Sequence, residues 1–340
     1  MLPIAIDVMS GDRQPHQYIA GALAALAENE ELRVLLVGDR ALIADELASC
    51  PAHLRERIEV VPASQVVAMS EHPREAVRRK KDSSMRLAVE LVKSGRAAAC
   101  VSAGNTGALT AIAHFVLKTL PGVERAAIIS AIPAAHGHTH MLDLGANTKA
   151  SAEQLRQFAT MGAIIARDVY GVSAPRIGLL NIGEEDIKGH EIVQGAHALL
   201  QSSDLNYVGF VEGDDIFSGD VDVVVTDGFT GNVALKTMEG LAALIADRMR
   251  REFRASWRDR LSGLLARGVL KRVASGLDPR RYNGACMVGL AGIVVKSHGG
   301  ADGVAFSRAV ITAALAVRHG LTAHIAQALA APQTTGGLTS

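Results

Sequence analysis

Short apolar runs alternate with helical patterns along nearly the whole chain. Such alternation of strands and helices favours a mainly parallel sheet with helices on both faces. Ser151, followed three residues later by Gln154, predicts a capping box at the start of one helix. The strands are expected at 3–8, 33–38, 57–62, 98–102, 126–132, 140–144, 176–182, 206–211, 221–226 and 291–296. The helices are expected at 16–28, 41–49, 83–94, 107–119, 151–169, 190–202, 231–253 and 305–330. The sequence therefore predicts an α/β protein with three α/β/α layers.

Composition narrows the class of protein. The 340 residues are 49% hydrophobic and 21% charged, and their formal net charge is zero, so we expect no nucleic-acid partner. The three cysteines form no CxxC pair and predict neither a disulfide framework nor a zinc site. Asp7 comes too early for a signal peptide, and no run of 18 uninterrupted apolar residues occurs. These features favour a cytoplasmic protein.

Most of the expected strands end in turns that combine glycine with polar residues. Glycine allows a positive φ and a close approach to a ligand, and a helix N-terminus that follows such a turn favours an anion. The carboxyl ends of parallel strands share one edge of a sheet, where ligands bind. The sequence therefore predicts a ligand site along one edge. The turns are 7–12, 102–108, 143–149, 181–189, 211–215, 226–232 and 296–302.

Several familiar signatures are absent from this chain. It contains no GxGxxG, no GxxxxGK[ST], no HExxH and no GxSxG, so the residues support neither a nucleotide cofactor nor a serine nucleophile. His136, His138 and His140 alternate in "HGHTH", which fits metal chelation but also an ordinary solvated loop.

Four motifs together resemble one family, the bacterial phosphate acyltransferases, which make acyl phosphates from acyl-acyl carrier protein for phospholipid synthesis. They are "GLLNIGEEDIKG", "TDGFTGNVALKTMEG", "SAGNTGAL" and "GIVVKSHGGAD", supported by "LDLGAN", within a resemblance that covers about residues 3–315. The chain departs from the family pattern at Val8, at Ser10 and in the run after "GAN". The resemblance implies an isopropylmalate-dehydrogenase-like, phosphotransacetylase-like fold in a homodimer.

The implied reaction joins the acyl group of a thioester to inorganic phosphate and releases the carrier thiol. Phosphate is largely dianionic near neutral pH, and a cysteine-like thiol leaves with a pKa of about 8.5. The site therefore has to position an anion and stabilise an oxyanion, and it needs no metal, no cofactor and no covalent nucleophile.

The resemblance also implies roles for individual residues. As catalytic groups it indicates Lys188, Asn232 and His298. Taken alone, these three would be a surface lysine, a helix N-cap and a structural histidine. The residues expected to bind phosphate or substrate are Gly11, Asp12, Asn105, Thr106, Gly107, Asp227, Gly228, Thr230, Gly231, Lys236 and Gly299.

One segment is strongly basic. Residues 248–281 contain eleven basic and three acidic residues, a net charge of +8, and their leucines and tryptophan form an apolar stripe. Gly263 and Gly268 predict a break there, with two short helices or a hairpin whose tip is "GLLARGVL". We expect a catalytic unit over 1–330, an inserted helical arm at 245–282 and a flexible tail at 331–340. The residues expected to contact a membrane are Trp257, Leu261, Leu264, Leu265, Val269 and Leu270.

The role of this basic arm remains open at the level of sequence. It fits a dimer interface, or a contact with acidic partners such as a carrier protein or an anionic membrane. Because members of the resembled family are peripheral membrane proteins, we expect attachment to the inner face of the cell membrane.

Other readings of the whole chain are a coenzyme A-dependent phosphotransacetylase, a β-decarboxylating dehydrogenase, and a membrane-surface scaffold without catalysis. An apolar acyl tunnel would separate the first from the leading reading. The metal-binding aspartate helix and arginine-rich motif of the second are not evident. The many polar strand-end turns argue against the third.

Overall fold

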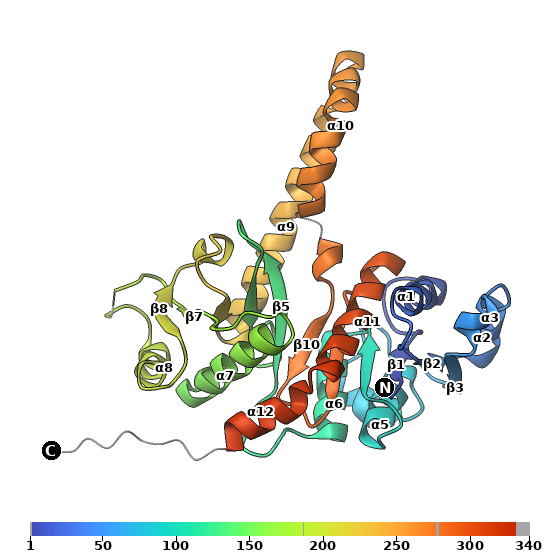
Figure 1. The fold of residues 1–340 in the computed structure, drawn as a ribbon, viewed down its shortest axis with the longest axis horizontal. Coiled ribbons are helices and arrows are strands. Elements are labelled where there is room, and N and C mark those ends of the chain that lie inside the picture. Colours follow the sequence, from blue (N-terminus) through green and yellow to red (C-terminus); the bar gives the residue numbers. More distant parts are fainter. Residues whose placement is uncertain (1, 186, 277–278, 331–340) are drawn as a thin grey trace.

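The structure is a computed structural model that describes residues 2–185, 187–276 and 279–330 (Figure 1). The expected tail at 331–340 lies outside these residues. The strands are β1 (Ile4–Asp7), β2 (Val34–Gly38), β3 (Ile58–Pro62), β4 (Ala99–Ser102), β5 (Ala127–Pro133), β6 (His138–Leu142), β7 (Ile177–Leu180), β8 (Tyr207–Val211), β9 (Val223–Val225), β10 (Ala285–Val288) and β11 (Ile293–Lys296). The α-helices are α1 (Pro15–Glu28), α2 (Arg40–Glu46), α3 (Ala52–Arg55), α4 (Pro73–Arg79), α5 (Ser84–Lys93), α6 (Thr106–Leu117), α7 (Ala152–Asp168), α8 (Glu191–Gln201), α9 (Gly228–Glu252), α10 (Trp257–Gly276), α11 (Gly303–Arg318) and α12 (Leu321–Ala330), with short 3₁₀ turns at η1 (Asp215–Phe217) and η2 (Pro279–Tyr282).

The strands form a single mixed sheet in the order β3-β2-β1-β4-β11-β10-β5-β6-β9-β7-β8. Seven of the ten pairings are parallel, and the three antiparallel ones are β11·β10, β10·β5 and β5·β6. Three successive reversals make β6, β9, β7 and β8 run opposite to β1, β4 and β11. The strand-end turns therefore lie at two edges, and the expectation of one common edge is wrong.

Helices cover both faces of this sheet, as expected for three layers. One face packs against the apolar sides of α1, α2, α7, α8, α11 and α12. The other face packs against α4, α5, α6 and the first turns of α9, through residues such as Ala234 and Met238. The predicted α/β/α fold is confirmed, and α6 and α9 lie over the same face of the sheet.

Two local expectations fail for identifiable reasons. Strand β10 was not expected, because its four residues stand between Gly284 and Gly289, and glycines on both sides favour a turn or loop. The pattern at 305–330 is two helices, since the chain turns at Gly320 with a φ of 60°. The capping box at Ser151 and Gln154 is confirmed.

Helices α9 and α10 form a long two-helix projection from the body of the molecule (Figure 1). The chain reverses at residues 253–256, so the expected break at Gly263 and Gly268 is wrong. Gly263 instead lies against the ring of Phe253, where an added Cβ would come within 2.9 Å of Cδ1. Within the described chain, no single helix combines the length and apolar composition of a membrane span. Helices α11 and α12 have the length and apolar composition of a span only when taken together, and the pair is bent by 52°.

Candidate functional site

The turn that follows β1 packs against the turn that follows β11. The backbone N–H of Asp12 donates to the carbonyl oxygen of Gly299 at 3.0 Å, and the Tyr18 hydroxyl donates to the same oxygen at 2.8 Å. An added Cβ at Gly299 would collide with the Asp12 carboxylate. Gly11, with a φ of 144°, leaves no room for a Cβ beside the Tyr18 hydroxyl. The predicted residues Gly11, Asp12 and Gly299 thus lie together in the structure. The two glycines permit the close packing of the two turns.

His298 lies exposed on the turn after β11. Its backbone N–H donates to the side-chain oxygen of Asn283 at 2.8 Å, and its Nδ1 accepts a hydrogen bond from the N–H of Gly300 at 3.0 Å. The acceptor role of Nδ1 leaves Nε2 as the ring atom that can face a substrate. The orientation of the His298 imidazole is thus fixed by two hydrogen bonds, one at its backbone N–H and one at Nδ1.

A candidate site residue that sequence reasoning did not single out is Lys296, the last residue of β11. Its ammonium group is buried, and it donates to the carbonyl oxygens of Ala103, at 3.3 Å, and of Ser297. Burial lowers the pKa of Lys296 to about 8, while the charge of Asp12 raises it and that of Lys236 lowers it further. A lysine directly after the apolar run "GIVV" was the signal that could have identified it.

The N-terminus of α6 lies at the end of neighbouring strand β4. The side-chain oxygen of Asn105 caps the helix by accepting from the N–H of Ala108 at 2.8 Å, and its amide donates to the carbonyl of Met69 at 2.5 Å. Thr106 and Gly107 are exposed in the first turn. Since β4 pairs with β11 so that Ser102 lies opposite Lys296, this helix end and the buried lysine share one edge.

A second cluster forms where β6 and β9 end. The buried carboxylate of Asp143 accepts hydrogen bonds from the N–H groups of Ile128, Gly145, Ala146 and Asn147, at 2.7–3.1 Å, and from the Asn147 side-chain amide at 3.0 Å. Burial raises the pKa of Asp143, and these hydrogen bonds oppose that shift. The aspartate of "LDLGAN" therefore shapes the turn, a role that sequence reasoning did not assign.

The N-terminus of α9 packs closely onto this turn. Asp227 caps α9 by accepting from the N–H groups of Phe229 and Thr230 and from the Thr230 hydroxyl, at 2.8–2.9 Å. The alternative reading of Asn232 as the cap is therefore wrong. Gly228 and Gly231 are buried against the backbone or carboxylate of Asp143, where a Cβ would collide.

Helix α9 then connects the two clusters. Asn232 is exposed one turn into the helix, and its side-chain oxygen lies 3.5 Å from where a Cβ on Gly145 would be. Lys236 follows one turn later, pairs with Glu239 at 2.6 Å, and is close enough to Lys296 for their charges to interact. Asn232 thus lies at the second cluster, and the charge of Lys236 acts on Lys296 in the first.

Lys188 lies on the long turn after β7, next to the edge where β9 ends. Its ammonium group is 3.9 Å from a Glu185 carboxylate oxygen, its side chain is 44% exposed, and the Asn181 amide donates to its carbonyl at 3.2 Å. Within the described residues no contact joins Lys188 to Asn232 or His298. Its proximity to Asn232 follows from the adjacency of the parallel strands β7 and β9, which precede these two residues.

The histidines of "HGHTH" belong to a different part of the molecule. His138 and His140 lie on β6 with ring centroids 4.8 Å apart, and the His140 ring is buried 4.2 Å from that of Tyr170. Burial lowers the pKa of His140 to about 3. The described residues include no group of three or more side chains placed to hold a metal ion.

Comparison with known proteins identifies the family. Residues 2–324 match the family model described as fatty acid synthesis protein. The chain is 55% identical to a phosphate acyltransferase of Alkalilimnicola ehrlichii, over 96% of this chain and 95% of that protein. It is also 55% identical to one of Methylococcus capsulatus, over 92% of each. A phosphotransacetylase from Streptococcus pyogenes has the same fold, with a TM-score of 0.63 at 15% identity over 93% of this chain and 94% of that one. A branched-chain phosphotransacylase from Enterococcus faecalis gives 0.55 at 14% identity, over 92% and 98%. The resemblance inferred from the motifs is confirmed: the chain belongs to the fatty acid synthesis protein family and is an acyltransferase.

Proposed function

We propose that the chain transfers the acyl group of a long-chain acyl-acyl carrier protein to inorganic phosphate, and so supplies acyl phosphate for glycerophospholipid synthesis. The observation that carries this proposal is the course of α9. Over two turns it presents an amide, Asn232, at the Asp143 turn and a cation, Lys236, whose charge acts on the buried Lys296. The reaction requires a hydrogen-bond donor that stabilises the oxyanion and cationic groups that bind phosphate. Asn232 and the two lysines would supply them.

Phosphate is expected to bind between Lys236, Lys296 and the exposed first turn of α6. These groups supply two cations and the free N–H groups of a helix N-terminus, all of which favour an anion. Asp12, whose charge is felt at Lys296, would keep that lysine protonated and oriented. The phosphate oxygen is then held ready to attack without any base, since the dianion is already a nucleophile.

The thioester carbonyl is expected to lie against Asn232 and Lys188. Attack by a phosphate oxygen forms a tetrahedral intermediate, whose negative oxygen these two donors would stabilise. Collapse of the intermediate breaks the carbon–sulfur bond and expels the carrier thiolate. His298 would stabilise the thiolate with a hydrogen bond from Nε2–H, since the ring that accepts at Nδ1 carries its proton on Nε2, and the thiolate then takes a proton from water. The products are acyl phosphate and free carrier protein.

Release of the carrier thiol tests this proposal. The pure protein is mixed with palmitoyl-acyl carrier protein, with or without phosphate, and free thiol is measured over time. We expect thiol release that depends on phosphate, and a much lower kcat/KM when palmitoyl-coenzyme A replaces the carrier protein. Equal or better use of the coenzyme A thioester would favour a phosphotransacetylase instead. Phosphate-independent release would identify a thioesterase.

We propose further that the protein is a homodimer attached to the inner, cytoplasmic face of the cell membrane through α10. Trp257, Leu261, Leu264, Leu265 and Val269 are each more than half exposed on this helix, beside the basic residues of the arm, whereas Leu270 is partly buried. Such a surface suits an anionic bilayer. Leu241, Leu244 and Ile245 form a second exposed stripe on α9, nearer the body, where a partner subunit could pack.

A further inference from the structure

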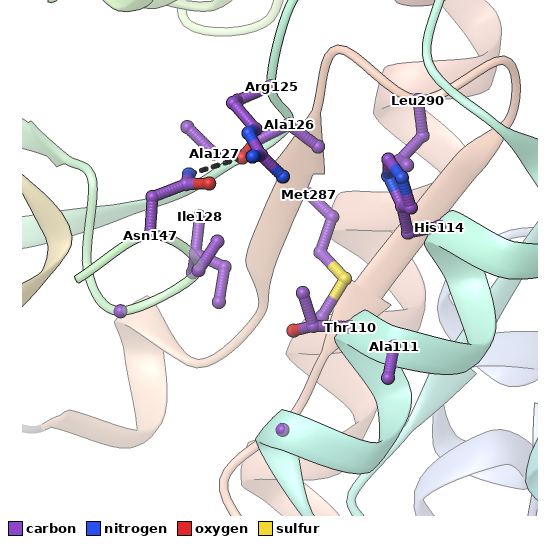
Figure 2. A pocket seen from close by; sticks show the side chains of 13 residues that line it. Thr110, Ala111, His114, Arg125, Ala126, Ala127, Ile128, Asn147, Met287 and Leu290 are labelled. Atoms are coloured by element: carbon purple, nitrogen blue, oxygen red, sulfur yellow. Dashed lines mark hydrogen bonds between the residues drawn. The ribbon is translucent and has the colours of Figure 1, made fainter. Parts of the chain in front are cut away.

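A pocket of about 300 Å³ lies between α6 and the turn after β6, over β5 and β10 (Figure 2). One wall is a single face of α6 that carries Gly107, Thr110, Ala111 and His114. Because Gly107 and His114 are separated by seven helical steps, the wall is about 10 Å long. The walls are mostly apolar, as in many ligand pockets.

The two ends of this pocket differ in chemistry. One end is formed by Gly107, in the exposed first turn of α6, and by Gly145, which faces Asn232. This end is therefore continuous with the candidate site. At the other end, His114 and Arg125 are exposed to solvent.

Arg125 is exposed and lines the pocket. None of the residues that the structure describes forms an ion pair or hydrogen bond with its guanidinium group. Figure 2 shows the guanidinium directed into the pocket, with Asn147 on the same side and His114 opposite. A cation without a partner at the mouth of an apolar channel fits a ligand with an anionic group at that point.

Asn147 offers a polar group inside the channel. Its side-chain nitrogen donates to the carbonyl of Ala126 at 2.7 Å and to the Asp143 carboxylate at 3.0 Å. These bonds fix the orientation of the amide, and Figure 2 shows its oxygen turned toward the pocket. The ligand in the channel should therefore carry N–H donors between its two ends.

We propose that this channel binds the phosphopantetheine arm of the thioester donor, with its phosphodiester at Arg125 and His114 and its thioester at Asn232. The inference rests on the proposed function, because it assumes a thioester donor. The arm is apolar with two amide groups, and its extended length equals about four peptide residues, or roughly 14 Å. An acyl chain suits the channel less well, since its methyl end would meet the guanidinium group.

Substitution of Arg125 tests the position of the phosphodiester. The donors are palmitoyl-acyl carrier protein, palmitoyl-coenzyme A and the palmitoyl thioester of N-acetylcysteamine, which lacks the phosphate. We expect Arg125→Ala to raise KM about tenfold or more for the first two donors and to leave kcat/KM for the third within twofold. Arg33→Ala, which removes an exposed arginine directly before β2 that does not line the pocket, is the control and should change none of these values.

The outcomes separate this inference from the function on which it rests. If Arg125→Ala affects all three donors equally, or none of them, the channel does not hold the arm. If the wild-type protein makes no acyl phosphate from any donor, the proposed function fails, and the inference fails with it.

Filling the channel gives a second test. Ala111→Phe should lower kcat/KM for acyl-acyl carrier protein at least tenfold, because the new ring would fill part of the channel. The loss should be similar for medium and long acyl chains. Ala24→Phe on the exposed face of α1 is the matched control. A loss confined to long acyl chains would place the acyl chain in the channel and overturn the inference.

Discussion

The ammonium group of Lys296 donates a hydrogen bond to the carbonyl oxygen of Ala103 at 3.3 Å, and so joins the ends of β11 and β4 inside the protein. No carboxylate among the described residues pairs with this ammonium group directly. A buried cation held mainly by carbonyl oxygens costs folding free energy and is typical of functional sites.

Replacing Lys296 should therefore separate stability from activity. Lys296→Met keeps much of the side-chain volume and removes the charge, so we expect acyl transfer to fall at least 100-fold, while the free energy of unfolding at pH 7 rises by about 1–3 kcal/mol. Urea denaturation and the phosphate-dependent assay measure the two quantities. A destabilised variant, or one with unchanged activity, would contradict the role given to Lys296.

The pH dependence of that stability difference has a definite sign. The pKa of Lys296 is lowered to about 8 from its usual 10.5, so the unfolded chain binds the proton more tightly between these values. Stability of the wild type should rise, relative to Lys296→Met, as pH increases from 8 to 10.5. The advantage of the variant at pH 7 should thus shrink above pH 8. A constant difference would mean that Lys296 has an ordinary pKa.

Lys188 is expected to act on the reaction and to contribute little to folding. Lys188→Ala should reduce turnover by two orders of magnitude or more, equivalent to roughly 3 kcal/mol of transition-state stabilisation, without changing the melting temperature. The half-exposed side chain explains the second expectation. Lys93→Ala, at an exposed lysine on α5, serves as the control. Turnover of Lys188→Ala within threefold of the wild type would exclude Lys188 from catalysis.

Much of the fold follows from the sequence, because ten of the eleven strands overlap the expected strand ranges. Strand direction did not follow. The three successive pairings β11·β10, β10·β5 and β5·β6 are antiparallel, and together they leave β6, β9, β7 and β8 opposite in sense to β1, β4 and β11. The strand-end turns are thus divided between two edges. Two features link turns from both: the course of α9, and the pocket that Gly107 and Gly145 line together.

The candidate site was predictable where motifs carried it, as at Asp12, Gly299 and Asn105. Other groups depend on tertiary packing. Asp143 organises its turn through five donors, and the burial of Lys296 depends on neighbouring strands, so the sequence shows neither property. For Asp227, the sequence pattern did not separate ligand binding from capping, since both place a carboxylate before a helix.

Buried His140 should make the protein sensitive to acid. Its pKa is lowered to about 3, mainly by burial, so between pH 6.5 and pH 3 the unfolded state binds a proton that the native state does not. Stability from this group is present above pH 6.5 and is lost as pH falls below it.

His140→Phe keeps a ring beside Tyr170 and removes the titrating group. We expect the wild type to lose about 2 kcal/mol more than this variant between pH 7 and pH 5, as measured by urea denaturation. The comparison is made between the two proteins because Asp7 and Asp143, whose pKa values burial raises, also titrate on acidification. Parallel stability curves would show that His140 takes up protons in the folded state.

The arm prediction concerns binding to membranes. Each basic residue near an anionic membrane surface contributes about 1 kcal/mol to the free energy of binding. Leucines that insert into the membrane add a hydrophobic contribution. Replacing both Leu264 and Leu265 with Glu should release the protein from anionic vesicles in a sedimentation assay and leave acyl transfer in solution near normal. The control replaces Val208 and Phe217, which are exposed elsewhere, with Glu. Continued sedimentation would exclude the membrane role of α10, and loss of dimer would assign the helix to the subunit interface.

Formation of acyl phosphate from isotope-labelled phosphate tests the central claim most directly. The pure protein is incubated with palmitoyl-acyl carrier protein and with inorganic phosphate that carries a heavy oxygen isotope at every oxygen. The products are examined by mass spectrometry. We predict palmitoyl phosphate that retains every labelled oxygen, because a phosphate oxygen attacks the thioester carbonyl. Unlabelled palmitate without acyl phosphate would show that water is the acceptor and would contradict the account.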